Sequence, residues 1–535
     1  MDHVAVGGRV LVASNRGPIS FTLGEDGQLS ARRGGGGMVS GLLSVASQCD
    51  LLWVCAALSD ADRAAARAVP GGLLDLDSPD GGPAAEAGSP TASSSAVRML
   101  DIPPDTFASA YNAVANSTLW FVHHMLYSLP SQPQFGPEFE RQWSAFREYN
   151  QAFAVALAEA DGTTGASGTT GASGTTGASG ADSRIPARAL VQDYHLTLVP
   201  RMLAELRPGL RIAHFSHTPW APPDYYRVLP DVVAREVLEG ILGADHAGFL
   251  CQRWADAFAD CCAAVLGAAV DREPGQVSDD GQVTYRGQVT YNGHVTSLGV
   301  HPLGVDAAGL RDRAAEPDVA ERAADLERIA AGRKLIVRID RTELSKNIVR
   351  GLAAYRELLR SRPEWRGRVM HLAFAYPSRT DLAEYRDYAA AVRDLAGEIL
   401  AEFGTGDWTP LVLQADDDYA RSLAGYRVAD VLLVNPVRDG MNLVAKEGPI
   451  LSERGCALVL SREAGAAAEL GGEALLVNPF DVSATAAALH QALSMSDAER
   501  ARRSARLAEA GGAFPPARWF ADQLAALDTT LDGVG

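Results

Sequence analysis

The chain has 535 residues, which is enough for two or more domains with hydrophobic cores of their own. Hydrophobic residues make up 47% of it and charged residues 21%, so it is not a disordered chain, and its 52 glycines and 28 prolines follow no collagen repeat. Acidic residues outnumber basic ones by 66 to 48, and the net charge of −18 argues against a surface that coats nucleic acid or anionic lipid. A small phosphorylated substrate is compatible with this charge, because a local cationic pocket can form inside an acidic protein.

The six cysteines indicate a reducing compartment. None forms a C-x-x-C pair, and two are adjacent at positions 261 and 262, which makes a poor disulfide framework. The first residues lack the basic and apolar regions of a signal peptide, and no apolar stretch reaches the roughly 18 residues that cross a bilayer. We therefore expect a cytoplasmic protein with no membrane or nucleic-acid partner.

Short aliphatic runs alternate with helical stretches rich in Ala, Leu, Arg and Glu through most of the chain. The first series of runs covers residues 10–13, 51–56, 190–191, 211–214 and 247–250. The second series covers residues 334–338, 369–374, 409–413, 428–434, 457–460 and 474–477. Continuous apolar runs separated by helices are typical of parallel strands buried on both faces. The pattern predicts an α/β protein with two Rossmann-like, doubly wound parallel-sheet domains, over residues 1–304 and 305–515.

Two segments of low complexity lie within the first predicted domain. Residues 162–182 repeat Gly-Thr-Thr-Gly-Ala-Ser with no apolar side chain larger than Ala, which predicts a flexible surface excursion. Residues 275–298 repeat Gly-Gln-Val-Thr-Tyr, and this alternation of polar and apolar residues around glycine predicts a β-hairpin or meander at the edge of the domain. We assign no chemistry to either repeat.

The first candidate site follows the first predicted strand. Asn15 and Arg16 come directly after that strand, and four glycines at positions 34–37 stand between a predicted hairpin and a predicted helix. Bare backbone N–H groups before a helix allow a phosphate or a sugar to approach closely. The run does not match G-x-G-x-x-G, however, and a merely flexible loop explains it equally well.

The second candidate site follows two later strands. Asp193 and His195 come directly after one strand, and His214 and His217 lie at the end of the next. Such positions face the ligand crevice of a doubly wound fold. His195 and His214 fit hydrogen-bonded core residues better, whereas we expect His217 to point into the crevice. No His, Cys or acidic residues have the spacing of metal ligands, so we expect no metal site.

The third candidate site is a pair of cations, Arg341 and Lys346, on the loop that follows the strand at residues 334–338. A diphosphate leaving group acquires negative charge as its bond to carbon breaks, and an enzyme without a metal must meet that charge with fixed cations. Arginine offers a planar fork and lysine a point charge, which suits this task. The alternative is solvated surface charge, the usual environment of both residue types.

The fourth candidate site follows the buried strand at residues 431–434. A tight loop, Asn435-Pro-Val-Arg438-Asp439-Gly440-Met441, leads into a helix predicted over residues 442–451. The N–H groups from Gly440 to Leu443 would present the positive end of that helix to an anion or a sugar oxygen. Asp439 could accept hydrogen bonds from sugar hydroxyls, and Glu447 could reach ribose hydroxyls. A purely structural helix cap would explain Asp439 but not the whole string.

The string Arg438-Asp-Gly-Met-Asn-Leu-Val-Ala-Lys-Glu447 resembles the signature of the trehalose-6-phosphate synthases, the retaining glycosyltransferase family 20, which has the GT-B fold. Further motifs of this family occur in the expected order over about residues 9 to 482. They are Ser14-Asn15-Arg16, Tyr111 with Trp120, Asp193-Tyr194-His195-Leu196, His217-Thr-Pro219-Trp220, Arg341 with Lys346, Ser378-Arg379, Ser461-Arg-Glu-Ala464-Gly-Ala-Ala467 and Val477-Asn-Pro-Phe-Asp481.

The resemblance implies a role for each matching position. The residues expected to hold the acceptor, glucose 6-phosphate, are Arg16, Tyr111, Trp120, Asp193 and Arg379. The residues expected to bind the nucleotide-glucose donor are Gly35, Gly36, Gly37, His217, Arg341, Lys346, Asp439, Gly440, Met441, Asn442, Leu443 and Glu447. Those expected to be catalytic are Asp193, His217, Arg341, Lys346 and Asp439.

The resemblance also implies the reaction and its setting. Glucose would move from UDP- or GDP-glucose to glucose 6-phosphate with retention of configuration, giving α,α-trehalose 6-phosphate and a nucleoside diphosphate. The reaction would take place in a cleft between the two domains and would need no cofactor and no protein-bound metal. We expect a C-terminal helix within residues 516–535 to cross back to the first domain, and the protein to form a homo-oligomer, a dimer or a tetramer.

Some positions depart from the common family pattern. Gln192 stands where many members have His, Asn347 where many have Gly, and Ala56 and Ala57 where some place a Trp. Three other functions are therefore considered: a glucosylglycerol-phosphate synthase, a cyclitol-coupling pseudo-glycosyltransferase and a catalytically silent sugar-phosphate sensor. The intact Asp-Gly-Met-Asn-Leu string disfavours the pseudo-glycosyltransferase, and the intact catalytic residues disfavour the sensor.

Overall fold

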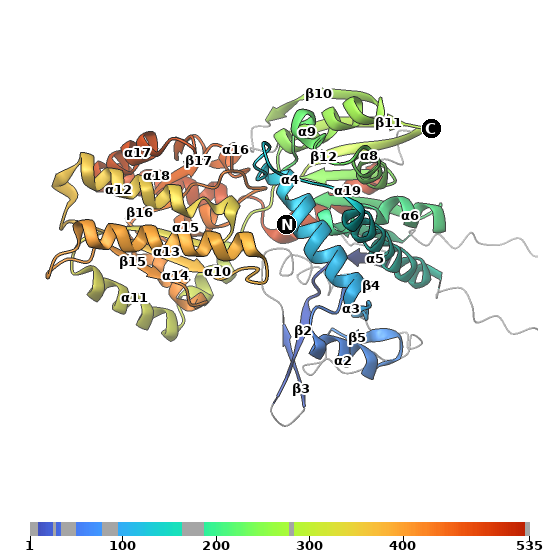
Figure 1. Cartoon of the computed structure of the whole chain (residues 1–535), viewed down its shortest axis with the longest axis horizontal. Coiled ribbons are helices and arrows are strands. Elements are labelled where there is room, and N and C mark those ends of the chain that lie inside the picture. Colours follow the sequence, from blue (N-terminus) through green and yellow to red (C-terminus); the bar gives the residue numbers. More distant parts are fainter. Residues whose placement is uncertain are drawn as a thin grey trace, which may run out of the picture. The chain divides into compact units, whose positions relative to one another are not determined.

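The computed structural model describes residues 9–24, 28–33, 50–76, 95–162, 187–277 and 283–529. They form two compact units (Figure 1). The first unit holds the residues up to His301 together with those from Ala517 onward, and the second holds Pro302–Pro516.

The first unit is built on a sheet of ten strands. Their bounds are β1 (Arg9–Ala13), β4 (Asp50–Ala56), β5 (Leu73–Asp75), β6 (Ala96–Leu100), β7 (Arg188–Gln192), β8 (Arg211–Ser216), β9 (His246–Phe249), β10 (Ala269–Val277), β11 (Val283–Tyr291) and β12 (His294–Val300). Their order is β10-β11-β12-β9-β8-β7-β1-β4-β6-β5. The strands from β12 to β6 run parallel to one another, as predicted for a doubly wound sheet, whereas β10, β11 and β5 add antiparallel edges.

The runs predicted as strands in this unit all lie in central strands, where side chains such as Val10 and Leu190 are fully buried. The sequence analysis did not predict β5 and β6. Strand β6 alternates between buried and half-exposed side chains, and its Arg98 pairs with Glu159 at 2.7 Å. An edge region of this kind lacks the continuous apolar run by which a central parallel strand is found.

The repeated Gly-Gln-Val-Thr-Tyr segment lies in β10, β11 and β12 at one edge of the ten-stranded sheet, and residues 278–282 are outside the described part. Strand β12 pairs antiparallel with β11, as in a meander, and also in parallel with β9, so it joins the edge strands to the parallel part of the sheet. A second hairpin, β2 (Ile19–Leu23) with β3 (Leu29–Arg33), follows β1 as predicted. Of the predicted excursion at residues 162–182, only Gly162 is described.

Helices cover the first unit's sheet. They are α2 (Asp60–Ala68), α3 (Pro104–Phe107), α4 (Trp120–His124), α5 (Pro137–Gly162), α6 (Val199–Leu206), α7 (Pro223–Tyr226), α8 (Asp231–Ile241), α9 (Gln252–Cys261) and α19 (Pro516–Thr529), with a π-helical segment over Ala108–Leu119. Helix α19 packs on β7 and β8: Trp519 meets Phe215 edge to face with ring centroids 5.0 Å apart, and Arg188 pairs with Asp528 at 3.0 Å. None of the described helices is long and apolar enough to cross a membrane.

The second unit has six strands, all parallel, in the order β15-β14-β13-β16-β17-β18. The strands are β13 (Lys334–Arg341), β14 (Val369–Tyr376), β15 (Leu411–Gln414), β16 (Val431–Val434), β17 (Ala457–Ser461) and β18 (Leu475–Val477). The helices are α10 (Ala307–Ala314), α11 (Pro317–Ala330), α12 (Ile348–Ser361), α13 (Ala383–Phe403), α14 (Tyr419–Val428), α15 (Val444–Leu451), α16 (Ala467–Leu470), α17 (Val482–Ser494) and α18 (Asp497–Gly512). Every strand predicted in this half of the chain is present.

Successive side chains of β13 serve opposite faces of this sheet. Ile336 joins a buried cluster with residues of α12, α13 and α17, whereas a Cγ of Val337 lies against Gly425 of α14 on the other face. Because both faces are covered, the strand is apolar at consecutive positions, which explains why the sequence revealed it. The six parallel strands also place the loops that follow them at the same edge of the sheet.

The connecting residues Gly304 and Val305 belong with the second unit. Their N–H groups donate to the carbonyls of Phe514 and Gly511 at 2.7 and 3.2 Å. The contacts therefore divide the chain a few residues before the boundary expected from the sequence between residues 304 and 305.

Candidate active site

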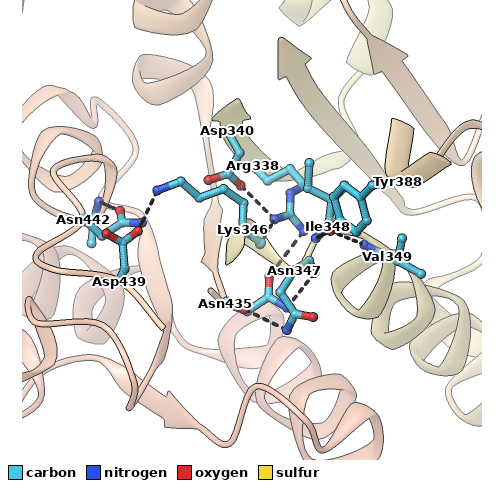
Figure 2. A network of polar contacts seen from close by, with 11 residues as sticks. Arg338, Asp340, Lys346, Asn347, Ile348, Val349, Tyr388, Asn435, Asp439 and Asn442 are labelled. Carbon is cyan, nitrogen blue, oxygen red and sulfur yellow. Dashed lines mark hydrogen bonds and ion pairs between the residues drawn. The ribbon is translucent and has the colours of Figure 1, made fainter. Parts of the chain in front are cut away.

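Lys346 and Asp439 lie at the centre of a charged cluster in the second unit (Figure 2). Their loops follow β13 and β16, which are neighbouring strands. Lys346 Nζ is 2.6 Å from Asp439 Oδ2, and the side-chain amide of Asn442 donates to the same oxygen at 3.0 Å. Burial alone would lower the pKa of Lys346, but the carboxylates of Asp439, Asp340 and Glu343 raise it. The ammonium group therefore stays charged at neutral pH.

Arg341 is the more exposed cation of this edge. Its side chain is 60% exposed, and its Nη1 lies 3.1 Å from Oε1 of Glu343, whose side chain is only 2% exposed. The hydroxyl of Ser378 donates to the same carboxylate at 3.1 Å. Burial acts to raise the pKa of Glu343, but Arg341, Arg379 and Lys346 outweigh this effect and lower it. Glu343 is thus an ionised carboxylate that pairs with Arg341 and faces the charges of Arg379 and Lys346.

Arg379 follows β14 in the second unit, whereas the other residues predicted to hold glucose 6-phosphate lie in the first unit. Its φ of 46° is in the left-handed region, and its Nη1 donates to the hydroxyl of Tyr385 at 2.6 Å. Its charge acts on Glu343 together with that of Arg341. The structure therefore groups this predicted acceptor residue with the predicted donor cations.

The loop after β16 is fastened to the loop after β17. Asp439 and Ala464 form a parallel bridge, the N–H of Gly465 donates to Asp439 O at 3.1 Å, and the N–H of Ala466 donates to Met441 O at 2.8 Å. A Cβ at position 465 would lie 1.9 Å from the carbonyl oxygen of Gly440, so only glycine permits this approach. Asp439, Gly440 and Met441 are consequently held by backbone contacts.

The prediction of a helix from Asn442 is wrong, because α15 begins at Val444. Asn442 has a φ of 82°, a conformation that a right-handed helix cannot include, and its Oδ1 accepts from the N–H of Ala445 at 3.2 Å. The N–H groups of Gly440 and Met441 therefore belong to the loop before the helix and not to its first turn. Leu443 is the residue directly before α15.

Glu447 lies in the first turn of α15 and is partly exposed. The hydroxyl of Tyr426 donates to its Oε2 at 2.9 Å, and burial raises the pKa of the carboxyl group. The preceding residue, Lys446, is fully buried, with Nζ 2.8 Å from Glu469 and 2.9 Å from the carbonyl oxygen of Leu303. These contacts fix α15 and with it the position of Glu447.

A buried guanidinium supports the loop that carries Lys346 (Figure 2). Arg338 is fully buried and donates to Asp340 Oδ2 at 2.7 Å, to the carbonyl oxygen of Lys346 at 3.0 Å and to Asn435 Oδ1 at 3.3 Å. A Cβ on Gly351 of α12 would lie 2.1 Å from Arg338 Nη1, so that position has room only for glycine. The backbone of the Lys346 loop is therefore held by the buried guanidinium of Arg338, whose charge is paired with Asp340.

In the first unit, Asp193 occupies a strained position at the end of β7. Its φ of 73° with ψ of 173° is rare for a residue with a side chain. Its carboxylate accepts from the N–H of His217 at 3.2 Å and lies 3.8 Å from Nδ1 of His195, and its carbonyl accepts from His214 Nε2 at 3.3 Å. Strain of this kind persists only where the surroundings fix it, which is typical of functional sites.

His217 is a neutral side chain packed among rings. Burial, with His214 nearby, lowers the pKa of His217 to about 3. Its Nε2 donates to Oε1 of Gln192 at 3.0 Å, and its ring lies 4.8 Å from that of Phe215 and 5.4 Å from that of Trp519 on α19. At neutral pH this imidazole therefore acts as an uncharged hydrogen-bonding group.

The remaining predicted acceptor residues also lie in the first unit. Tyr111 stacks on His195 with ring centroids 5.5 Å apart, which connects it to the Asp193 cluster. Trp120 is 5% exposed and packs on His124, and Arg16 is exposed on the turn after β1. The predicted donor positions Gly35, Gly36 and Gly37 lie outside the described residues.

The sequence analysis assigned no role to three of these residues: Glu343, Gln192 and Trp519. Glu343 could have been predicted, because an acidic residue between two predicted cations in the sequence is well placed to pair with one of them. Gln192 was noted only as a departure from the family pattern. The contact of Trp519 with His217 could not be predicted, because the sequence of a helix does not show which residues it packs against.

Chemically, the second unit groups charged side chains that suit an anion, and the first unit groups a carboxylate and stacked rings that suit a sugar. Across the described residues, no group of three or more His, Cys, Asp or Glu side chains is placed to hold a metal ion. The exposed guanidinium of Arg341 and the ammonium of Lys346 are suited to a phosphate group. Asp193, Asp439 and Glu447 are suited to sugar hydroxyls.

Comparisons with known proteins agree with this chemistry. The model of glycosyltransferase family 20 matches residues 186–528. The Aspergillus fumigatus protein named alpha,alpha-trehalose-phosphate synthase (UDP-forming) 2 is 32% identical, over 96% of this chain and 95% of its own. The bifunctional trehalose-6-phosphate synthase/phosphatase of Thermoproteus tenax is also 32% identical, over 77% of this chain, which spans 51% of that relative. The Escherichia coli structure solved with UDP-2-fluoro glucose superimposes with a TM-score of 0.74 and 26% identity, over 97% of this chain and 98% of its own.

Proposed function

The chain belongs to glycosyltransferase family 20 and has its GT-B architecture, and from this we propose that it transfers glucose from a nucleotide-glucose to glucose 6-phosphate. The products are α,α-trehalose 6-phosphate and a nucleoside diphosphate. The observation that carries the proposal is the charged edge of the second unit, where Arg341 ends β13, Lys346 lies on the loop that follows, and the family's Asp439 lies on the neighbouring loop. UDP-glucose is the proposed donor because the relatives are named as UDP-forming, with GDP-glucose as the alternative.

Arg341 and Lys346 have the role of stabilising the departing diphosphate. As the bond from C1 of glucose to the phosphate oxygen breaks, negative charge gathers on the diphosphate, and two cations already in place stabilise it without reorganisation. Lys346 exchanges its contact with Asp439 for one with the phosphate when the donor binds, before the bond from C1 breaks. This exchange leaves Asp439 available for the hydroxyls of the transferred glucose.

Asp193, His217 and Glu447 orient the sugars. Asp193 has a carboxylate at the strained end of β7, where it can accept from acceptor hydroxyls, and the neutral His217 beside it can hydrogen-bond the transferred glucose. Glu447 accepts from the ribose of the donor. In the proposed step the C1–O bond to the acceptor forms on the face that the diphosphate leaves, and the acceptor's proton passes to the departing phosphate oxygen. Retention of configuration follows from this geometry.

The remaining site residues have supporting roles in the proposal. Arg16 and Arg379 are cations for the phosphate of glucose 6-phosphate, and Tyr111 and Trp120 pack against its ring. Gly440, Met441, Asn442 and Leu443 offer backbone N–H groups to the donor, as does one of the glycines at positions 35–37. The proposed enzyme needs no cofactor and no metal, so chelators would leave its activity unchanged.

We also propose a cytoplasmic location and a homo-oligomeric state. The five cysteines in the described part of the chain, Cys55, Cys251, Cys261, Cys262 and Cys456, are all buried free thiols, which suits a reducing compartment. Light scattering of the purified protein would decide between a monomer, a dimer and a tetramer.

A product assay tests the proposed function. The purified protein is incubated with glucose 6-phosphate and, separately, with UDP-, GDP- and ADP-glucose, with and without a chelator. We expect a disaccharide monophosphate by mass spectrometry and an α,α-1,1 linkage by NMR. If no donor gives this product but glycerol 3-phosphate or an aminocyclitol phosphate is glycosylated, the acceptor assignment is wrong. Binding of the sugar phosphate without any turnover would identify a sensor.

A further inference from the structure

Asn347 lies directly between Lys346 and the first residue of α12, in an unusual conformation. Its φ of 57° and ψ of 36° are left-handed, and the residue is only 2% exposed. Glycine adopts this conformation at the least cost, and among residues with a side chain asparagine tolerates it best. A buried Asn at such a position therefore raises the question of what its amide contributes that glycine could not.

The amide of Asn347 joins the ends of three strands. Its Nδ2 donates to the carbonyl oxygen of Asn435, just after β16, at 2.9 Å and to that of Pro479, just after β18, at 2.8 Å. Its Oδ1 accepts from Arg350 at 2.9 Å. Asn347 itself follows β13, so one side chain links three loops at the same edge of the sheet (Figure 2 shows it beside Asn435).

The side chain of Asn347 does not serve its own helix in the usual way. An Asn directly before a helix normally accepts a hydrogen bond from the helix's first N–H groups. Here the hydroxyl of Tyr388 accepts from the N–H groups of Ile348 and Val349, at 2.6 and 3.4 Å. The structure therefore supplies another acceptor for the helix end, so Oδ1 of Asn347 accepts from Arg350, while Nδ2 donates to the two neighbouring loops.

These links bear directly on Lys346. Its ammonium group stands at the end of a flexible four-carbon stem, so its position depends on how firmly the backbone beneath it is held. The carbonyl oxygen of Lys346 accepts from Arg338 at 3.0 Å, and Ser345 O accepts from the N–H of Val437 at 2.8 Å. Asn347 fastens the other side of Lys346 to the loop that also carries Asp439.

We propose that Asn347 is a positioning residue for the glucosyl transfer: its amide holds the Lys346 loop against the ends of β16 and β18, so that the ammonium group already occupies the place where the leaving diphosphate gains charge. The inference rests on the proposed function. It adds to that function a residue that does not touch substrate and acts through Lys346.

The main variant is Asn347→Gly, which keeps the left-handed backbone and removes only the amide. We expect kcat to fall about 10- to 100-fold, because a small displacement of a transition-state cation is costly in rate. The KM for glucose 6-phosphate should change less than about threefold, because Lys346 is proposed to stabilise the leaving diphosphate in the transition state and does not hold the acceptor. Asn347→Asp is a second variant of nearly the same shape, whose carboxylate oxygens would face two carbonyl oxygens, and it should lose at least as much activity.

A double-mutant cycle separates positioning from general support of the fold. If Asn347 acts through Lys346, adding Asn347→Gly to Lys346→Ala should lower kcat by less than about twofold more. The matched control is Tyr355→Phe, which removes a buried 2.7 Å hydrogen bond from α12 to the carbonyl oxygen of Pro410, before β15. Its kcat should equal that of the wild type even if its melting temperature falls.

The outcomes are distinct. Absence of trehalose 6-phosphate with the wild-type protein would contradict the proposed function itself. With an active wild type, an unchanged kcat in Asn347→Gly would overturn the positioning role, as would a loss that persists in full in the Lys346→Ala background. If neither Asn347 variant folds at the assay temperature while Tyr355→Phe does, Asn347 supports stability rather than the position of Lys346, and the proposal is again overturned.

Discussion

In the second unit the candidate site is a set of ionised groups that pair with one another, whereas in the first unit, apart from the exposed Arg16, it is a set of rings and uncharged hydrogen-bonding groups around the carboxylate of Asp193. Lys346 and Asp439 form an ion pair of 2.6 Å above the buried pair of Arg338 and Asp340, at 2.7 Å. In the first unit, His217 is held by Gln192 and by the ring of Trp519. The two sets of residues thus offer different interactions to a ligand.

The difference follows from the two substrates. A departing diphosphate changes its charge during the reaction, and only fixed charges respond to that change without reorganising. The acceptor hydroxyl gives its proton to the departing phosphate as it attacks and so builds up little charge, and what it needs is orientation, which stacked rings and hydrogen bonds provide. Apart from Arg379, which is proposed for the acceptor's phosphate, the charged residues of the second unit should therefore control kcat, and the residues of the first unit should control the use of the acceptor. The following tests address this division.

The largest effect is expected from the exposed cation. Arg341→Ala should lower kcat by about 10² to 10³-fold, because it removes a group that binds the leaving diphosphate most strongly in the transition state. The protein should still fold, since the Arg341 side chain is 60% exposed, with a modest fall in melting temperature because the buried Glu343 loses one counter-charge. Steady-state release of nucleoside diphosphate measures the first effect and thermal unfolding the second. Arg356→Ala, which removes another cation of the same unit away from this loop, is the control; full activity of Arg341→Ala would remove the leaving-group role.

Asp193→Asn should have the next largest effect, in the first unit. The amide has nearly the same size and shape as the carboxylate, so the backbone cost of φ 73° and ψ 173° is unchanged, but one acceptor oxygen beside the N–H of His217, where the acceptor sugar is proposed to bind, is replaced by a donor. We expect kcat/KM for glucose 6-phosphate to fall about 10- to 100-fold, mostly through orientation. Glucose 6-phosphate titrations at saturating donor measure it. An effect confined to the KM of the donor would contradict the assignment of Asp193 to the acceptor.

The sequence predicted the charged half more completely than the uncharged half, for a physical reason. The charged residues lie at or after the ends of buried parallel strands: Arg341, Lys346, Asp439 and Glu447. Such strands can be recognised in the sequence as continuous apolar runs, and the loops that follow them meet at one edge of the sheet. The contact of His217 with Trp519 joins residues some 300 positions apart, and no local pattern encodes it. The start of α15 was predicted wrongly because the composition of residues 442–451 favours a helix throughout. It does not reveal that Asn442 has a left-handed backbone and belongs to the preceding loop.

Acid should destabilise the uncharged half before it affects the ion pairs. Burial lowers the pKa of His214, which is 1% exposed, to about 4, whereas the unfolded chain takes up the proton near pH 6.5. Stability from this neutral ring is present above pH 6.5 and is lost as the pH falls towards 4, by about 2 kcal/mol at pH 5. Urea unfolding at pH 8 and pH 5 measures the loss. His214→Gln should be less stable at pH 8 but less sensitive to pH, and an equal pH dependence in both proteins would show that folding does not lower the pKa of His214.

The smallest effect is expected at the ring that supports His217. Trp519→Phe keeps an aromatic side chain but leaves space beside the imidazole, whose ring centroid is 5.4 Å from that of Trp519. Because His217 would still donate to Gln192, we expect its orientation to loosen without being lost, and kcat/KM for glucose 6-phosphate to fall only about two- to fivefold. The KM for the nucleotide should not change, since the charged edge of the second unit is untouched. A fall as large as that of Asp193→Asn would mean that packing, more than the hydrogen bonds of Asp193 and Gln192, determines how the uncharged half holds its substrate.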